Sequence, residues 1–434
     1  MKTLLSICCS ALVFAGFSQT PTNIIIFEKG EKSSFAPCEP SIAVNPSNPS
    51  EMVAGAVLNY VATSPDSGKT WETDYMKSRY GVYGDPCIVA DEKGRFYYFH
   101  LSDPSGKGWN DPSILDRIVC QRSNGIGKKW NKGFAPSPNG TKDQDKEWVA
   151  VHPTLGYLVM TWTEFDTYGA ADDSCKSRIL MAISENGKKW SRPYTISQTE
   201  GNCIDDSKTV EGATPAFSVD GDIYVSWSMN GDIKFVAIDM QDWKNKAEQK
   251  PRIGPEQTIV NGGANWTFEI PGLGRANGMP ITLYDLSSGP NKGTIYINWA
   301  DQRNGENDTD IWMISSKDKG KTWTEKVRVN DDKAGSQQFF TWATIDQSNG
   351  NIYAVFYDRR NHSDNSTDVY LATSKDGGKS FENQQISEDS FTVPEGIFFG
   401  DYNNISAVNG VIRPIWTSVK NGKLVVMTAL INEK

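Results

Sequence analysis

Short runs of alternating apolar and polar residues recur along the whole chain, and Gly, Asn and Asp separate them. In the clearest unit, residues 342–346, 351–357 and 368–374 form three such runs, and a fourth follows. Alternation with a period of two, rich in aromatic and β-branched residues, predicts half-buried β-strands. Four antiparallel strands in about 50 residues make one blade of a β-propeller. The pattern therefore predicts an all-β repeat fold.

A turn sequence follows the third run of several units. The pattern S-x-D-x-G-x-[ST]-aromatic occupies residues 64–71, 316–323 and 374–381, and degenerate copies occupy 123–130 and 184–190. The Asp carboxylate accepts backbone N–H groups within a tight turn, and Gly supplies a positive φ. The closing aromatic residue then packs beneath the turn. Five copies in register indicate structural repeats rather than chance.

The spacing of the repeats predicts seven blades, with six as the alternative. The inner strands are expected to begin near Pro40, Pro86, Trp148, Thr214, Pro280, Trp342 and Asn403. The last unit, residues 403–430, shows only three strands. An Ile-rich run at residues 23–27 would supply the missing outer strand and close the ring. We thus expect a β-propeller of four-stranded antiparallel blades, closed by an N-terminal strand.

Residues 1–18 have the pattern of a secretory signal peptide. Lys2 precedes an apolar stretch from Leu4 to Phe17, and Ser18 precedes the expected cleavage site. The stretch is too short to span a bilayer. We therefore expect a single domain, residues 19–434, that is secreted, periplasmic or at the cell surface, without a membrane span.

Composition fits an exported globular protein. The chain has 14 Trp, 16 Tyr and 18 Phe, and its formal net charge of −9 argues against nucleic acid as a partner. Five cysteines remain after cleavage, and an odd count leaves at least one thiol without an internal partner. Cys175 and Cys203 flank one repeat in polar loops and would be able to pair. We expect a monomer.

The turn motifs, together with the segments 299–303 (WADQR), 356–360 (FYDRR) and 399–402 (FGDY), resemble the BNR or Asp-box proteins of the sialidase superfamily. The resemblance covers nearly the whole mature chain and implies a sialidase-like β-propeller. It also implies that Asp66 and the other Asp-box carboxylates are structural and lie opposite the active site. Glycoside hydrolysis is the activity that the resemblance suggests.

Candidate functional residues are expected on the other face, just before each inner strand and just after each second strand. Paired carboxylates there would serve glycoside hydrolysis, a Tyr would replace a carboxylate as nucleophile, and arginines would bind acidic groups of a glycan. The predicted catalytic residues are Asp85, Glu211, Asp301, Asp358, Asp401 and Tyr402. The predicted substrate-binding residues are Glu39, His100, Glu147, Glu164, Arg303, Tyr357, Arg359 and Arg360.

The chain departs from catalytic sialidases at one position. Where those enzymes carry an Arg-Ile-Pro motif, this chain has Cys38-Glu39-Pro40, and Glu39 would repel a sialic acid carboxylate. Strict exo-sialidase activity is therefore not expected. Three functions stay open: a glycoside hydrolase acting on an acidic glycan, a non-catalytic propeller that binds carbohydrate or protein, and a polysaccharide lyase with His100 as base.

No cofactor is expected, and a structural Ca²⁺ ion is the one metal that the sequence leaves open. Acidic pairs in three loops offer oxygen ligands, although solvated acidic loops are the better explanation on composition. These pairs are Asp172 with Asp173, Asp205 with Asp206, and Asp308 with Asp310. The expected partner is a glycan or polysaccharide substrate.

Overall fold

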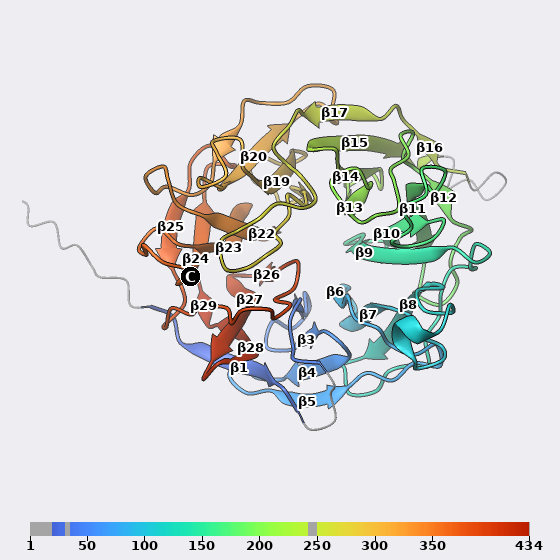
Figure 1. Ribbon diagram of the computed structural model, residues 1–434, viewed down its shortest axis with the longest axis horizontal. Coiled ribbons are helices and arrows are strands. Elements are labelled where there is room, and N and C mark those ends of the chain that lie inside the picture. Colours follow the sequence, from blue (N-terminus) through green and yellow to red (C-terminus); the bar gives the residue numbers. More distant parts are fainter. Residues whose placement is uncertain (1–19, 31–34, 242–249, 434) are drawn as a thin grey trace, which may run out of the picture.

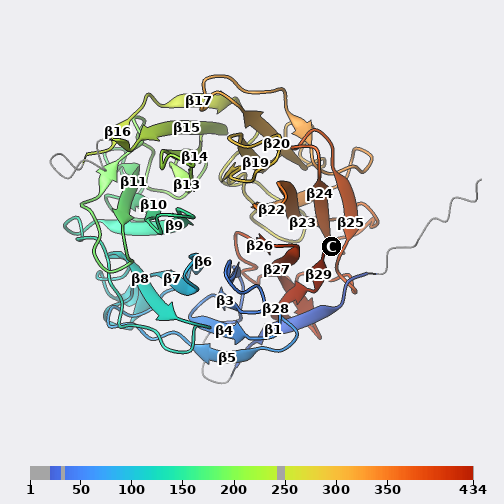
Figure 2. The ribbon, with the colours of Figure 1, turned by 180° about the vertical axis from the view of Figure 1, so that it is seen from behind.

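Seven antiparallel β-sheets stand in a ring around a central axis in the computed structural model (Figure 1, Figure 2). The structure describes residues 20–30, 35–241 and 250–433, so the expected signal peptide lies outside the described residues. The innermost strand of each sheet faces the axis, and the outermost strand lies at the rim. The prediction of an all-β, seven-bladed propeller is confirmed.

In the first three blades, the strands follow one another from the axis outwards. They are β2 (Ser41–Val44), β3 (Met52–Ala56), β4 (Tyr60–Ser64) and β5 (Glu72–Tyr75); β6 (Cys87–Ala90), β7 (Arg95–Leu101) and β8 (Ile118–Asn124); and β9 (Asp143–Val151), β10 (Leu158–Phe165), β11 (Ser177–Ser184) and β12 (Tyr194–Thr195). A single 3₁₀ turn, η1 (Gly108–Asn110), lies between β7 and β8.

The next three blades repeat this order. They are β13 (Glu211–Phe217), β14 (Ile223–Met229), β15 (Asp232–Asp239), β16 (Arg252–Ile253) and β17 (Gln257–Val260); β18 (Ile281–Tyr284), β19 (Ile295–Asp301), β20 (Asp310–Ser316) and β21 (Val327–Arg328); and β22 (Gln338–Asp346), β23 (Asn351–Asp358), β24 (Asp368–Ser374) and β25 (Glu382–Gln385). Both β16 and β17 pair with β15.

The second blade has three strands where the sequence pattern suggested four. Isolated bridges, Cys120 with Phe134 and Ser123 with Trp130, replace its outer strand. Pro136 and Pro138 follow these bridges. Because proline has no N–H to donate, a continuous ladder does not form there.

Both ends of the chain build the seventh blade, as the sequence predicted. Its strands are β26 (Asn404–Val408), β27 (Val411–Lys420), β28 (Lys423–Ala429), the outermost β1 (Asn23–Glu28), and β29 (Ile431–Asn432), which pairs with β27. In the register of β1 and β28, Ile25 faces Met427 and Phe27 faces Val426. This pairing closes the ring and leaves β1 between the seventh blade and the first (Figure 1).

The Asp-box turns lie at the end of the ring where the inner strands finish. Ser64, the last residue of β4, lies beside Met52 of β3, which lies beside Val44 at the end of β2. Asp66 Oδ1 accepts the N–H of Thr70 at 2.9 Å, and the two other full copies repeat this bond. These carboxylates therefore stabilise turns at the opposite end from the starts of the inner strands.

Candidate functional site

A cavity of about 420 Å³ opens at the end of the ring where the inner strands begin. We call it the funnel. The segments that precede or begin β2, β6, β9, β13, β18 and β26 contribute to its wall. Its charged lining residues are Glu39, Asp85, Asp145, Lys146, Asp205, Glu211, Arg275 and Asp401. A larger hollow of about 680 Å³ beside β1 and β28 has no comparable cluster of carboxyl groups, so the funnel is the candidate site.

Four of these charged residues, including Asp205 with a φ of 62°, have a left-handed backbone. The φ angle is 49° at Glu39, 49° at Asp85 and 52° at Lys146, and Gly212 has a φ of 71° at the corresponding place in β13. For residues other than glycine this conformation costs about 1 kcal/mol or more. Such strain persists where the surrounding structure enforces it, and it clusters at functional sites. The strained residues here all lie at the mouth of one cavity.

Two cations hold the carboxylates of the funnel together. Lys146 Nζ lies 3.4 Å from Asp85 Oδ2. Arg275 donates from Nη1 to Asp205 Oδ2 at 3.0 Å and from Nε to Asp401 Oδ1 at 3.1 Å. These ion pairs connect loops of different blades in a network of two groups, one around Lys146 and one around Arg275.

Burial and mutual repulsion shift the proton equilibria of this network. Burial, with the charges of Asp85 and Asp205, raises the pKa of Asp145 to about 8. Burial likewise raises the pKa of Glu39 well above its usual range. Burial alone would lower the pKa of Lys146, but Asp85 and other carboxylates outweigh it and raise that pKa. Near neutral pH, Asp145 therefore carries a proton while Lys146 stays charged.

Glu211 has an unusual environment. Its side chain is 1% exposed, lines the funnel, and has no hydrogen-bond partner at either carboxyl oxygen within the described residues. Burial, followed by the charges of Asp205 and Asp145, raises its pKa well above the usual range. A buried carboxyl group without a partner is costly, because nothing replaces its lost hydration.

Aromatic side chains form the rim of the funnel. Trp109 stacks on Tyr168 with ring centroids 5.3 Å apart, and it meets the ring of Tyr83 edge-on at 6.1 Å. Trp109 is 58% exposed and Phe398 is 57% exposed. Exposed, rigid aromatic faces beside a polar cavity suit the apolar faces of sugar rings.

Three aromatic rings meet at the axis, further along the inner strands from the funnel mouth. The Trp148 and Trp342 rings, from opposite sides of the propeller, lie 4.1 Å apart, and Trp148 meets Tyr402 edge-on at 5.7 Å. Lys146 precedes Trp148 by two residues on β9 and lines the cavity above these rings. The rings do not line the cavity, and Tyr402 connects them to it through Lys146.

The structure brings four of the predicted site residues together. Glu39, Asp85, Glu211 and Asp401 all line the funnel. Tyr402 lies beneath them, 3% exposed, with its hydroxyl 3.4 Å from the Pro86 carbonyl oxygen. Burial and then Asp85 raise its pKa, so its hydroxyl stays protonated.

Other predicted residues lie outside the funnel in closed ion pairs. Asp301 is fully buried and accepts two hydrogen bonds from Arg303 Nε, at 2.8 and 2.9 Å. Asp358 is also fully buried, and Arg360 Nε donates to it at 2.8 Å. Each Arg follows its Asp by two residues, so the pair closes the end of the second strand.

The remaining predicted residues are buried outside the funnel, and most of them hold neighbouring segments. Arg359 donates to the Pro271 carbonyl, Tyr357 donates to the Thr417 carbonyl, and Asn139 and Lys142 contact the Glu164 carboxylate. The imidazole of His100 contacts the Leu101 carbonyl, and burial lowers its pKa to about 4. Glu147, at 2% exposed, has no hydrogen-bond partner among the described residues and does not line the funnel.

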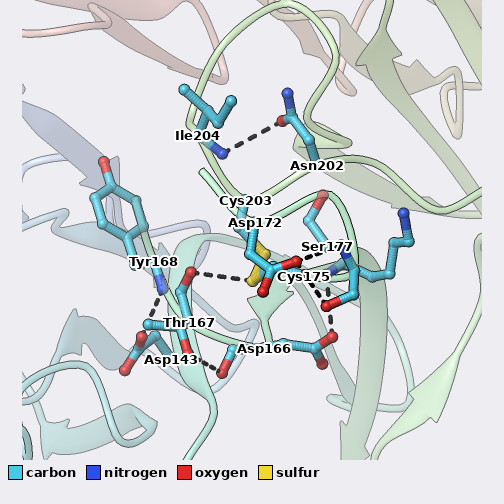
Figure 3. The surroundings of a disulfide bond; sticks show 12 residues. Asp143, Asp166, Thr167, Tyr168, Asp172, Cys175, Ser177, Asn202, Cys203 and Ile204 are labelled. Carbon is cyan, nitrogen blue, oxygen red and sulfur yellow. Dashed lines mark hydrogen bonds between the residues drawn. A yellow bond between two sulfur atoms is a disulfide. The ribbon is translucent and has the colours of Figure 1, made fainter. Parts of the chain in front are cut away.

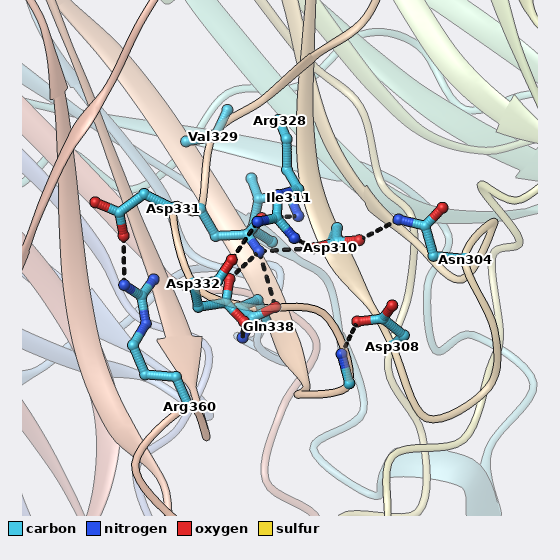
Figure 4. Close-up of polar contacts among 12 residues, drawn as sticks. Asn304, Asp308, Asp310, Ile311, Arg328, Val329, Asp331, Asp332, Gln338 and Arg360 are labelled. Carbon is cyan, nitrogen blue, oxygen red and sulfur yellow. Dashed lines mark hydrogen bonds and ion pairs between the residues drawn. The ribbon is translucent and has the colours of Figure 1, made fainter.

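The acidic loop pairs have structural contacts. Among the described residues, no group of three or more His, Cys, Asp or Glu side chains is arranged to hold a metal ion. Asp310 binds Asn304, Asn330 and Arg328, and Asp308 accepts the N–H of Gly335 (Figure 4).

Cys175 and Cys203 form a disulfide, with Cα atoms 5.8 Å apart (Figure 3). It joins the loops that carry Tyr168 and Asp205, and the Tyr168 hydroxyl donates to Asp205 Oδ2 at 2.8 Å. The other described cysteines, Cys38, Cys87 and Cys120, are buried free thiols. The pairing that the sequence offered is thus present, and it supports one side of the funnel.

Four charged residues of the funnel were not among the predicted site residues: Asp145, Lys146, Asp205 and Arg275. Asp145 and Lys146 lie beside a register shift between β9 and β10, which changes the face to which each residue points. Asp205 had been considered only as a cation ligand. Arg275 lies in the long connection before β18, where no periodicity signals its position.

No known family model matches the chain. The solved structures that are similar to it include Hadza microbial sialidase Hz136, at 14% identity over 88% of this chain and 73% of that chain, with a TM-score of 0.49. An α-L-arabinanase of Penicillium chrysogenum, complexed with arabinobiose, has 14% identity over 82% and 98%, with a TM-score of 0.47. A Dyadobacter fermentans protein of unknown function has 12% identity over 78% and 94%, with a TM-score of 0.49.

The chain is a seven-bladed β-propeller, and the solved structures similar to it include sialidases. Within the described residues, no helix is long and apolar enough to cross a bilayer.

Proposed function

We propose that this propeller is a glycoside hydrolase and that the funnel is its active site. The observation that carries the proposal is Asp145, a carboxyl group that is partly open to the cavity and whose pKa is raised to about 8. A carboxylic acid that stays protonated at neutral pH, beside other carboxylates, is the arrangement by which glycosidases separate acid from base or nucleophile.

In the proposed reaction, Asp145 donates its proton to the glycosidic oxygen as the bond from that oxygen to the anomeric carbon breaks. Asp85, held by Lys146, either activates the water that attacks the anomeric carbon or attacks it directly before hydrolysis. Asp401 is held by Arg275 and is the second candidate for this role. The leaving sugar takes the proton of Asp145, water supplies the new hydroxyl group at the anomeric carbon, and the remaining proton of that water restores Asp145 to its acid form.

The rim and the disulfide support a glycan substrate and an exported protein. The exposed face of Trp109, stacked on Tyr168, would bind a sugar ring next to the cleaved bond. Disulfides persist in oxidising compartments, so the Cys175–Cys203 bond supports the predicted export. The acidic character of the glycan stays a prediction. Lys146 and Arg275, the two cations that line the funnel, already bind carboxylates of the protein itself.

A non-catalytic glycan-binding propeller is the second candidate, and the exposed aromatic rim is the observation that favours it. Such a protein would need the rim but not a protonated Asp145. The lyase hypothesis depended on His100, which is buried against Leu101 and Gln121 and does not line the funnel. The structure therefore gives His100 no position from which to act as the base of a lyase at the funnel.

The test is mass spectrometry of products after the pure protein is incubated with neutral, amino-, sialylated, uronate-containing and sulfated glycans. We expect fragments that carry one added water for each cleaved bond, and no activity in Asp145→Asn. Binding without products across the panel would instead support the second candidate. A product with a new double bond would identify a lyase.

A further inference from the structure

We infer that the substrate carries a cationic amino group, as in a hexosamine without its acetyl group, and that Glu211 binds that group. The inference rests on the proposed function, because it takes the funnel as a glycan site and names the class of glycan. Its basis is the charge of the funnel and the environment of Glu211.

The first observation is the imbalance of charge in the wall. Six carboxyl groups face two cations, Lys146 and Arg275, which gives a formal charge of −4 when all six are ionised and −3 when Asp145 is protonated. Both cations are already occupied by Asp85, Asp205 and Asp401. An acidic sugar would meet repulsion here, whereas a cationic group would relieve it.

The second, independent observation is Glu211 itself. Both of its carboxyl oxygens lack a hydrogen-bond partner within the described residues, although the side chain is 1% exposed and faces the cavity. A substrate ammonium group would donate N–H bonds to these oxygens and supply the missing positive charge. An ammonium group at this position would favour the ionised form of the Glu211 carboxyl group.

The aromatic rim decides between a sugar and a basic peptide. Trp109 and Tyr168 present a stacked pair beside the acidic wall, and Tyr168 itself bonds to Asp205. A ring that stacks on Trp109 and carries an amine toward Glu211 would use both features. A flexible lysine chain would use only the charge, so we favour the amino sugar.

Isothermal titration calorimetry with three β-1,4-linked tetrasaccharides tests the inference. Chitosan tetraose, chitin tetraose and cellotetraose carry an amine, an acetamide and a hydroxyl at the same carbon. We expect wild-type protein to bind the amine about tenfold or more tightly than the hydroxyl compound. Glu211→Gln should remove this preference without weakening cellotetraose binding, and Glu185→Gln, an exposed carboxylate in an Asp-box turn, should change nothing.

Equal affinity for the three tetrasaccharides would overturn the inference, as would tighter binding of sialyllactose or of tetralysine than of chitosan tetraose. The wild-type series decides this even when Glu211→Gln fails to fold. Because binding is measured, the result is separable from the proposed hydrolysis. A preference for the amine without cleavage would contradict only the proposed function. Cleavage without a preference for the amine would contradict only this inference.

Discussion

The ammonium group of Lys146 lies 3.8 Å from the centre of the Tyr402 ring. The two residues come from β9 and from the segment before β26, on different blades. The same nitrogen lies 3.4 Å from Asp85 Oδ2, and the side chain is 6% exposed. A cation on an aromatic face, away from water, is stabilised by the ring and by the carboxylate together. Lys146 thus links the Tyr402 ring to the acidic wall of the funnel.

Lys146→Met should therefore destabilise the protein strongly. Its removal leaves Asp85 and the neighbouring buried carboxyl groups without their cation, which we expect to cost about 3–5 kcal/mol. Urea unfolding measures this directly, and Lys146→Arg, which keeps the charge, should lose less. Stability equal to that of wild type in the Met variant would contradict the assigned role of Lys146.

Asp145 should make stability depend on pH. Its carboxyl group titrates near pH 4 in an unfolded chain and at about 8 in the folded protein, so the folded state holds an extra proton between these values. The contribution of Asp145 to the free energy of unfolding therefore falls as the pH rises across that window. Asp145→Asn should raise the melting temperature relative to wild type by about 2 °C or more at pH 8. The gain in melting temperature should shrink toward pH 4. A gain that does not change with pH would contradict the raised pKa of Asp145.

Asp301→Asn should affect stability but not function. The change weakens the buried pair with Arg303, at an expected cost of about 2 kcal/mol, because Arg303 keeps some contact with water. Its carboxylate does not line the funnel, so kcat/KM of the folded variant should match wild type. A large loss of activity in a fully folded Asp301→Asn variant would make Asp301 a catalytic candidate again.

The Cys175–Cys203 disulfide should matter for both stability and activity. Its cysteines are 28 residues apart, and closing a loop of this length stabilises a fold by about 3 kcal/mol. The double variant Cys175→Ser, Cys203→Ser should unfold at lower urea concentration. It should also lose glycan affinity, because Tyr168 and Asp205 lie on the joined loops. Unchanged affinity would show that the hydrogen bond alone positions them.

The fold followed from the sequence because its signals are local. Each Asp-box turn is specified within eight residues, and β1 was expected because residues 403–430 lacked a strand. Glu39 and Asp85 were found for the same reason, since each directly precedes the proline at the start of an inner strand.

The site followed only in part because its contacts are long-range. Arg275 reaches Asp401 across more than a hundred residues, and no periodicity announces that contact. Conversely, Asp301 and Arg303 are two residues apart, and this spacing alone lets them neutralise one another. Charged residues that follow a second strand in the sequence therefore did not always line the funnel.

The general-acid role of Asp145 is tested most directly by changing the leaving group. kcat/KM of wild type and Asp145→Asn is measured on the hydrolysed glycan and on a dinitrophenyl glycoside of the same sugar, whose leaving group departs without a proton. We predict a loss of about 100-fold or more on the glycan and little loss on the dinitrophenyl glycoside. The wild-type rate on the glycan should also fall above about pH 8. Equal losses on both substrates, or no loss on the glycan, would contradict the account.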